Sequence, residues 1–331
     1  MRKIAIDAMG GDRAPASTVL GAVTAAQNSE GRFEIVLVGD ENVVKSELGR
    51  YKSDSLNISV MHAPEIIGMS ESPTEALRKK VNSSISVLTR LLKNGEVDGI
   101  VSAGNTGAYT ASCLLTVRKI EGVKRPTIGT FIPCENGSRF LLDVGANPDC
   151  RPIHLLQSAI MGSIFIEYML KRKDPRVGLL NIGEESSKGN ELSIETYKLL
   201  KESSLNFVGN IEGRDILKGI ADVIVCDGFV GNIILKYTES FFCVFEEKLK
   251  TKAGRNFLSK LGLFILSPIL EKIMKEFDYQ EYGGVPLLGI NGVAIICHGD
   301  SSPKAIMNAV ERAYLMIERK VNEHIRERIT E

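Results

Sequence analysis

The stretch "IAIDAMGGDRAP", Ile4–Pro15, is the first of a series of strand-to-helix turns that decide the fold class of this chain. A short apolar run ends in Asp7, and Gly10, Gly11 and Asp12 follow it. Glycines after a strand let backbone N–H groups approach a ligand closely. Because two aspartates beside that place would repel a phosphate, we expect Asp7 and Asp12 to hold something else.

Outward from this stretch, apolar β-branched runs alternate with helical patterns. The predicted strands are Ile4–Met9, Glu34–Val38, Ile58–His62, Gly99–Ser102, Thr127–Ile132, Phe140–Val144, Val177–Ile182, Asn206–Val208, Val223–Cys226 and Val293–Cys297. The predicted helices are Ala16–Gln27, Pro73–Lys93, Ala108–Arg118, Pro152–Lys171, Glu191–Glu202, Asn232–Lys252 and Pro303–Arg328. Several strands are apolar on consecutive positions, which is typical when helices cover both faces. The alternation predicts an α/β fold with a doubly wound, mainly parallel sheet.

Composition narrows the class of protein. The 331 residues are 44% hydrophobic and 25% charged, as in ordinary globular proteins. Lys+Arg and Asp+Glu both number 41, so no overall basic charge argues for a nucleic-acid partner. The six cysteines are scattered without metal-ligand spacing, which indicates free thiols in a reducing cytosol. The sequence opens with a strand pattern rather than a signal peptide and has no apolar run near ~20 residues, so we expect a cytoplasmic protein.

Six predicted strands end in turns that carry Gly together with Asn, Asp, Ser or Lys. Besides the opening stretch, these are SAGNTGA at Ser102–Ala108, DVGANPD at Asp143–Asp149, NIGEESSKGNE at Asn181–Glu191, CDGFVGN at Cys226–Asn232 and CHGDSS at Cys297–Ser302. Ligands bind doubly wound sheets at the carboxyl ends of strands. One such turn is ordinary strand-to-helix geometry. Six that converge on one face of one sheet predict an anion site built from helix N-termini.

Polar side chains in and after these turns are the candidates for chemistry. Lys188 and Lys236 are candidate partners of an anion. The alternative for Lys188 is an ordinary lysine of a surface loop, and the alternative for Lys236 is a lysine on a solvated helix face. His298 fits an acid–base group or a buried, hydrogen-bonded histidine. Asp227 either orients a lysine or an N–H group or caps the following helix. The candidate phosphate- or substrate-binding residues are Gly10, Gly11, Ser102, Asn105, Thr106, Gly107, Asn147, Gly189, Gly228, Gly231 and Gly299.

The sequence motifs typical of several other reaction classes are absent. The opening glycine turn does not have the full G-x-G-x-x-G spacing, and neither a G-x-x-x-x-G-K-[ST] loop nor a G-x-S-x-G elbow occurs. The four histidines lie far apart and form no metal motif. We therefore expect neither a cofactor nor a metal.

A second feature is an amphipathic, basic segment at Phe241–Asp278 that surrounds the apolar decapeptide LGLFILSPIL, Leu261–Leu270. The decapeptide is too short to span a bilayer and too apolar for an ordinary loop. It predicts a helical hairpin, inserted at about 240–280 in a single α/β catalytic domain of residues 1–331, that touches a membrane surface or packs into a dimer partner. The predicted membrane contacts are Leu261, Leu263, Phe264, Ile265 and Leu266.

Together these motifs resemble those of the PlsX family of phosphate acyltransferases. The matching stretches run in the family's order over nearly the whole chain. They are DAMGGD at 7–12, SAGNTGA at 102–108, LDVGAN at 142–147, LLNIGEE with KG at 179–189, CDGFVGN with Lys236 at 226–236, and HG at 298–299.

The resemblance implies an activity, a fold and partners. The activity is transfer of a long-chain acyl group from acyl carrier protein to inorganic phosphate, which yields acyl phosphate and free carrier protein. The product feeds a glycerol-3-phosphate acyltransferase and thus phospholipid synthesis at the membrane. The implied fold is that of isocitrate dehydrogenase and phosphate acetyltransferase, and the implied state is a cytoplasmic, peripherally membrane-associated homodimer.

The residues fit this chemistry without a metal or a protein nucleophile. Phosphate already carries a nucleophilic oxyanion, and a thiol with a pKa of about 8.5 leaves with little acid assistance. What remains is to hold phosphate against the thioester carbonyl and to stabilise the tetrahedral oxyanion. We expect phosphate and oxyanion to be held by lysines, asparagines (Asn105 among them) and helix N-termini, with a histidine donating to the oxyanion or the leaving sulfur. The expected catalytic set is Lys188, Lys236, His298, Asp227 and Asn232.

Three aspartates at or just after strand ends are expected to orient the site rather than react. Asp7 and Asp12 are predicted to accept N–H groups from neighbouring loops or to pair with Lys188 or Lys236, and Asp143 is placed with them. The acidic carrier protein requires a basic surface. The sequence offers Arg78–Lys80, Arg118–Lys119 with Lys124–Arg125, and the hairpin lysines.

Three alternatives stay open. A phosphate acetyltransferase-like enzyme that uses acyl-coenzyme A shares the chemistry but has no need of the apolar hairpin tip. A β-decarboxylating dehydrogenase of similar fold needs a cluster of metal-binding aspartates and arginines, which we do not find in the sequence. A peripheral membrane scaffold has no use for so many polar residues at strand ends.

Overall fold

The computed structural model describes residues 1–253, 261–262, 264–270 and 279–330, and within them the strands form one 11-stranded sheet. Its order is β3-β2-β1-β4-β11-β10-β5-β6-β9-β7-β8. The strands are β1 (Arg2–Asp7), β2 (Phe33–Gly39), β3 (Ile58–His62), β4 (Gly99–Ser102), β5 (Thr127–Cys134), β6 (Gly137–Leu142), β7 (Val177–Asn181), β8 (Phe207–Glu212), β9 (Val223–Val225), β10 (Val285–Leu288) and β11 (Val293–Ile296).

The sheet has two halves that run in opposite directions. In one half β1 pairs in parallel with β2 and β4, and β4 with β11. In the other half β9 pairs in parallel with β6 and β7, and β7 with β8. Between the halves, β11 pairs antiparallel with β10, β10 with β5, and β5 with β6. Three reversals therefore leave the carboxyl ends of the two halves at opposite edges of the sheet.

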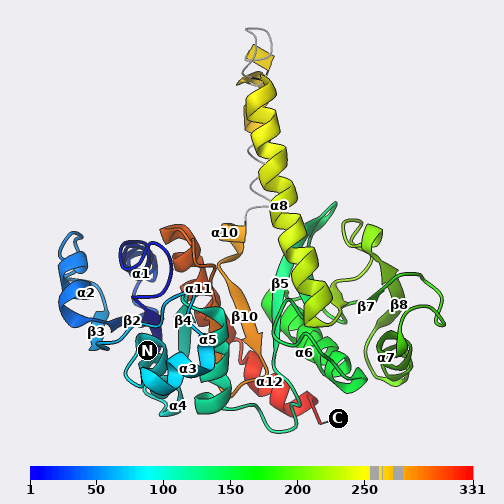
Figure 1. Cartoon of the computed structure of the whole chain (residues 1–331), viewed down its shortest axis with the longest axis horizontal. Coiled ribbons are helices and arrows are strands. Elements are labelled where there is room, and N and C mark those ends of the chain that lie inside the picture. The colour runs from blue at the N-terminus through cyan, green and yellow to red at the C-terminus, as the bar shows by residue number, and fades with distance from the viewer. Residues whose placement is uncertain (254–260, 263, 271–278, 331) are drawn as a thin grey trace.

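Helices cover both faces of this sheet. They are α1 (Ala16–Asn28), α2 (Glu41–Leu48), α3 (Pro73–Lys79), α4 (Ser84–Lys93), α5 (Thr106–Ser112), α6 (Pro152–Leu170), α7 (Glu191–Glu202), α8 (Gly228–Ala253), α10 (Tyr279–Tyr282), α11 (Pro303–Glu318) and α12 (Val321–Arg328), with a π-turn, η1, at Cys113–Val117 and a 3₁₀ turn, η2, at Gly213–Asp215. Figure 1 shows their arrangement.

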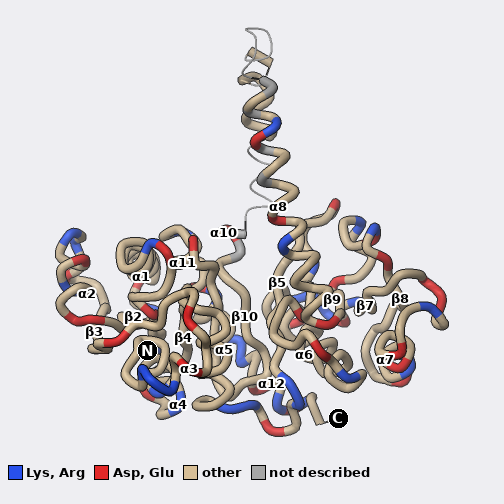
Figure 2. Tube along the Cα trace, viewed as in Figure 1, with Lys and Arg blue, Asp and Glu red and all other residues tan. Residues whose placement is uncertain are grey.

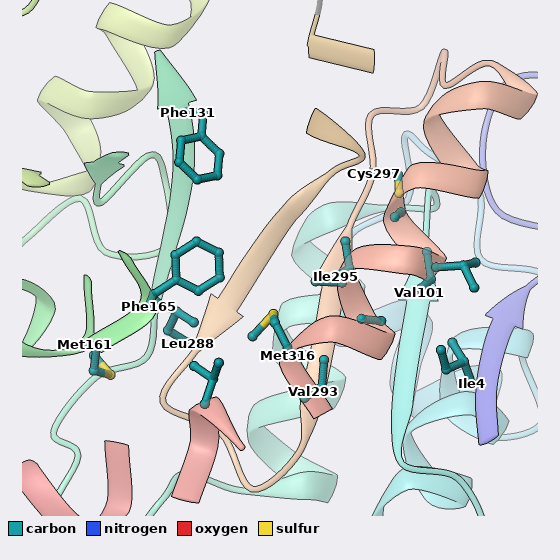
Figure 3. Close-up of a cluster of buried hydrophobic side chains, with 14 of the residues drawn as sticks. Ile4, Val101, Phe131, Met161, Phe165, Leu288, Val293, Ile295, Cys297 and Met316 are labelled. Atoms are coloured by element: carbon teal, nitrogen blue, oxygen red, sulfur yellow. The ribbon is translucent and has the colours of Figure 1, made fainter. Parts of the chain in front are cut away.

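Alternate residues of the central strands enter two separate cores. Ile4 and Ile6 of β1 belong to a core that also contains residues of α1, α11 and α6, whereas Ala5 belongs to a second core with residues of α4 and α5. Figure 3 shows part of the first core, which extends from Ile4 to Phe165 across both halves of the sheet. All three β1 residues are fully buried, so consecutive apolar positions do mark strands covered on both faces. The predicted doubly wound α/β fold is confirmed.

Two predicted helices are each divided in the structure. The predicted helix at 73–93 is α3 and α4, with Ser83 accepting a hydrogen bond from the backbone N–H of Ser86 at the start of α4. The predicted helix at 303–328 is α11 and α12, because Lys320 adopts a left-handed conformation with φ 51°. Helix periodicity continues across both breaks, so the pattern did not reveal them. Two further elements, α2 and β10, are not among those predicted from the sequence.

α8 begins earlier than predicted and extends beyond the body of the protein. It starts at Gly228 rather than at the predicted Asn232, and its far half projects from the body of the protein (Figure 1). Helical backbone is also present at 264–270, within the predicted hairpin tip. Leu263 and most of the second arm of the hairpin lie outside the described residues, and the division into one domain with an inserted hairpin stays a prediction.

Among the described helices, α6 alone has the length and apolar composition of a membrane span. In its most apolar window 56% of the residues are buried inside the protein, and core helices pass the same test. α6 packs against β6, β9, α7 and α12, so it serves here as a core helix.

Candidate functional site

The predicted site residues form two groups rather than one. The first group lies after β1, β4 and β11 and comprises Asp7, Gly10, Gly11, Asp12, Ser102, Asn105, Thr106, Gly107, His298 and Gly299. The second group lies after β6, β7 and β9 and comprises Asp143, Asn147, Lys188, Gly189, Asp227, Gly228, Gly231, Asn232 and Lys236. Since the two halves of the sheet run in opposite directions, the prediction that all six turns converge on one face of the sheet is wrong.

The distance between the two groups is much larger than the distance between reacting atoms. Four strand spacings of about 4.8 Å lie between β11 and β9, so the loops are on the order of 20 Å apart. Acyl transfer requires reacting atoms within hydrogen-bond distance. Lys188 and His298 of one chain therefore do not act on the same atoms in this arrangement.

Asp7 is the centre of the first group. Its side chain, 1% exposed, accepts hydrogen bonds from Ser102 Oγ at 2.8 Å and from the backbone N–H of Met9 at 3.2 Å. Burial raises the pKa of this carboxyl, while its hydrogen bonds oppose the rise. The N–H group that Asp7 accepts comes from its own turn rather than from a neighbouring loop, and the contact from another strand is the Ser102 hydroxyl. The alternative that Asp7 pairs with Lys188 or Lys236 is wrong. Gly10 has no room for a side chain, because a Cβ there would lie 2.7 Å from Gly104 N.

Asn105 and Ser102 are occupied within the protein. Asn105 Oδ1 accepts from the N–H of Ala108 at the start of α5, and its Nδ2 donates to the carbonyls of Gly68, Met69 and Glu71. Ser102 Oγ donates to Asp7 and accepts from the N–H of Gly104. Both residues are buried, so the prediction that these side chains contact phosphate is corrected to a structural role. Thr106 and Gly107 in the same turn are exposed.

His298 and Gly299 bring the end of β11 to this group. The backbone N–H of Asp12 donates to Gly299 O at 2.7 Å, which ties the opening glycine turn to the β11 turn. The His298 side chain is exposed, so its reading as a buried histidine is wrong. Its Nδ1 accepts from the N–H of Asp300 at 3.2 Å. In the neutral ring this leaves Nε2 as the N–H donor, the form suited to an oxyanion or a leaving sulfur.

Asp143 organises the second group. Its Oδ1 accepts from the backbone N–H groups of Gly145 at 3.0 Å and Ala146 at 2.9 Å, and its Oδ2 accepts from Asn147 Nδ2 at 2.7 Å. Burial raises the pKa of Asp143 against these hydrogen bonds. Asn147 Nδ2 also donates to Pro126 O at 2.7 Å, and the residue is buried, so Asn147 joins two loops. The orienting role predicted for Asp143 agrees with these contacts.

The N-terminus of α8 is built against this loop. Asp227 Oδ1 accepts from the N–H groups of Phe229 at 3.0 Å and Val230 at 2.9 Å, so Asp227 caps α8. Asn232 Nδ2 donates to Val144 O at 3.0 Å. The backbone of Gly231 lies directly against the carbonyl of Asp143. A cap and two close packings thus fix the first turn of α8 on the loop after β6.

Lys188 and Lys236 are the exposed cations of the second group. The loop of Lys188 is held by its backbone, whose N–H donates to Glu185 O and whose carbonyl accepts from Asn181 Nδ2 at 3.0 Å. Gly189 beside it has φ 100°, a conformation that favours glycine. No described carboxylate forms a salt bridge with the side chain of either lysine. Both charges are therefore available to an anion.

Exposed apolar side chains on the same elements as these lysines were not predicted from the sequence. Ile182 is 82% exposed in the loop of Lys188, and Phe229 and Ile233 are 62% and 53% exposed in the first two turns of α8. These apolar residues stand in the motifs quoted above, as NIG and GFVGNI. The sequence does not show whether an apolar side chain is exposed or buried. Cations beside exposed apolar side chains suit a ligand with an anionic head and an apolar chain.

Comparison with known proteins agrees with these observations. The family model described as fatty acid synthesis protein matches residues 2–324. A phosphate acyltransferase of Syntrophotalea carbinolica is 46% identical over 322 residues, 97% of this chain and 92% of the relative. A phosphate acyltransferase of Desulforamulus reducens is 49% identical over 327 residues, 99% of this chain and 97% of the relative.

Solved structures with this fold include two phosphotransacetylases. The enzyme of Streptococcus pyogenes matches with a TM-score of 0.63 at 18% identity, over 96% of this chain and 94% of its own. The EutD phosphotransacetylase of Staphylococcus aureus matches with a TM-score of 0.60 at 17% identity, over 97% and 94%. At this identity they establish the fold alone, which is the predicted phosphate acetyltransferase-like one. With a family model over almost the whole chain and full-length relatives at 46–49% identity, the chain belongs to the fatty acid synthesis protein family, PlsX.

Proposed function

We propose that this protein is a phosphate acyltransferase that moves a long-chain acyl group from acyl carrier protein to inorganic phosphate, and that the acyl phosphate feeds phospholipid synthesis. The observation that carries the proposal is the second group. Two exposed lysines without described carboxylate partners lie on elements that also expose Ile182, Phe229 and Ile233. The cations suit phosphate and the apolar side chains suit the acyl chain.

The reaction needs positioning and charge stabilisation from the protein. A phosphate oxygen attacks the thioester carbonyl, the carbonyl oxygen becomes an oxyanion, and the C–S bond then breaks to release the carrier thiolate. Lys188 and Lys236 hold phosphate, and preorganised donors stabilise the oxyanion. Asp227, Asn232 and Asp143 act by fixing the N-terminus of α8 beside the reacting atoms. His298 Nε2 donates to the oxyanion or to the leaving sulfur.

This set of residues acts together in a homodimer. His298 and Lys188 lie at opposite edges of one sheet, and we infer that a two-fold axis brings the first group of one protomer to the second group of its partner. Each dimer then has two sites, and each site takes one group from each protomer.

The dimer is tested by mixing two inactive variants, Lys188→Ala and His298→Ala. Subunit exchange at equal amounts makes about half of the dimers mixed, and each mixed dimer has one site with both groups intact. We expect about a quarter of wild-type activity after exchange and at most about a tenth for either variant alone. If the mixture stays as inactive as its components, the shared site is wrong.

The exposed apolar side chains further along the hairpin support the remaining parts of the proposal. Leu261, Phe264, Ile265 and Leu266 are 46%, 76%, 67% and 51% exposed. Apolar side chains of this size at the end of a projection suit the acyl region of a bilayer, which agrees with a cytoplasmic enzyme that touches the membrane. They also favour a long acyl chain over acetyl-coenzyme A as the donor, the choice made by a phosphate acetyltransferase-like enzyme.

The activity is tested by incubating the purified protein with palmitoyl-acyl carrier protein and measuring free carrier thiol with and without phosphate. We expect thiol release that depends on phosphate and proceeds without added metal. Release from acetyl-coenzyme A alone would instead assign the acetyltransferase activity. No thiol release with either donor would favour the non-enzymatic membrane scaffold.

A further inference from the structure

A basic patch lies beside the second group, and it is defined by Arg118, Lys119, Lys124, Arg125 and Arg151. All five side chains are exposed, and no described carboxylate forms a salt bridge with any of them. Acidic residues in the same segments are limited to Glu121 and Asp149. Figure 2 shows blue segments along the η1–β5 loop, interrupted by one red position.

Two chain segments supply the five residues, and within the first of them Lys119 Nζ donates to Lys124 O at 2.8 Å. Burial lowers the pKa of His154, and the positive charges of Arg125, Arg151 and Lys119 lower it further. His154 belongs to the first turn of α6, so the N-terminus of that helix adds to the positive field. The patch therefore concentrates positive charge at one place.

The loop that carries most of the patch is held in place by its backbone. Asn291 donates from its backbone N–H to Arg118 O and from Nδ2 to Lys119 O, at 3.0 Å and 2.7 Å. Lys124 N donates to Gln157 Oε1 at 2.8 Å. Ile120 and Val123 between them are buried in the core. Charged side chains on a fixed loop lose little backbone entropy when a partner binds.

The patch borders the second group directly. Cys150 follows the loop of the second group, and its Sγ donates to Asn147 O at 3.4 Å. Burial raises the pKa of this thiol, the charges of Asp143 and Asp227 raise it further, and that of Arg125 lowers it. Pro126, next to Arg125, accepts a hydrogen bond from Asn147. The patch also lies at the opposite end of the molecule from the projecting part of α8, along the lower edge of Figure 1. A partner bound there does not compete with contacts made by the projection.

We propose that the basic patch is the docking surface for the acyl carrier protein. This proposal rests on the proposed function, which supplies an acidic protein donor. Of the three basic surfaces that the sequence offered, Lys80 is paired with Glu71 and Lys79 with Glu75, and most of the hairpin lysines lie outside the described side chains. The basic patch alone combines unpaired charge, a fixed backbone and a border with the second group. Complementary charge of this kind steers an acidic partner and sets its orientation.

The test is the double charge reversal Arg118→Glu/Lys124→Glu, which spares Arg125 at the border of the site. The control is Lys52→Glu/Lys201→Glu, which makes the same change in net charge at two exposed positions on other parts of the surface. Steady-state rates are measured at low ionic strength with palmitoyl-acyl carrier protein and with palmitoyl-pantetheine, which has no carrier protein.

We expect the patch variant to raise KM for palmitoyl-acyl carrier protein by at least about ten-fold, with kcat within about two-fold of wild type. KM for palmitoyl-pantetheine should stay unchanged in the patch variant, and the control should behave as wild type. An unchanged KM for the carrier protein, or an equal rise with both donors, overturns the assignment. Loss of binding to phosphatidylglycerol vesicles in the patch variant alone also overturns it, since the patch would then bind lipid.

Binding of fluorescently labelled carrier protein, followed by anisotropy, separates this proposal from the proposed function. If wild type binds the carrier and the patch variant does not, the surface is correct even when wild type transfers no acyl group to phosphate. If both bind equally, the surface is wrong whatever the activity.

Discussion

Lys188→Ala is expected to lower kcat for phosphate-dependent thiol release by at least about ten-fold, because it removes a charge from the group that holds phosphate and the developing oxyanion. The side chain is exposed and forms no salt bridge with a described carboxylate, so its loss should leave folding intact. The loop itself stays in place, since the backbone of Lys188 makes its hydrogen bonds to Glu185 and Asn181. The measurement is the initial rate with saturating palmitoyl-acyl carrier protein over a range of phosphate concentrations.

The matched control is Lys201→Ala, an exposed lysine on the neighbouring helix α7. It removes the same charge from the same half of the sheet but lies at the far end of α7 from the loop of Lys188. We expect near wild-type rates and an unchanged thermal midpoint. Wild-type turnover in Lys188→Ala would remove Lys188 from the mechanism.

Gly231→Ala is expected to destabilise the protein by about 3 kcal/mol and to abolish activity in whatever folded protein remains. A Cβ at Gly231 would lie far inside contact distance of the Asp143 carbonyl oxygen and 3.0 Å from Cys226 Sγ. Both neighbours are buried and directly follow strands β6 and β9, so they cannot move aside without disturbing the sheet. Relief would require α8 to shift away from the loop that Asp143 organises.

The control for this substitution is Gly213→Ala. A Cβ at Gly213 meets no atom within 4 Å, so the added methyl group should change stability little. Thermal and urea unfolding of the two variants are compared with wild type. Equal stability of Gly231→Ala and Gly213→Ala would show that α8 does not press on Asp143 as described.

The fold was predictable because its signals are local. Consecutive apolar positions marked β1, and they do enter two cores, one with Ile4 and Ile6 and the other with Ala5. What no local pattern shows is strand direction. The β5–β6 pairing and the four-residue strand β10 reverse the sheet three times, and each reads as an ordinary short apolar run. The six glycine turns were therefore found, but their division between two edges was not.

For the candidate site, the positions of the side chains in the fold were more predictable than their roles. Asp227, Asp143 and the two lysines lie where the turns placed them. Asn105 and Asn147 direct their amide N–H donors to neighbouring loops, and Asn105 Oδ1 also accepts from the N–H of Ala108. Residue type alone does not distinguish an asparagine that joins loops from one that binds phosphate.

α8 begins at the candidate site and continues as unbroken helix for 26 residues, from Gly228 to Ala253. At about 1.5 Å per residue it is a rod of about 39 Å. Its base is clamped by Asp227 and Asn232, so the rod has no joint at the body of the protein. The number of helical turns in α8 therefore sets the distance between the second group and any surface that the far end of α8 touches. An apolar product released beside Ile233 must cover that same fixed distance to reach the surface.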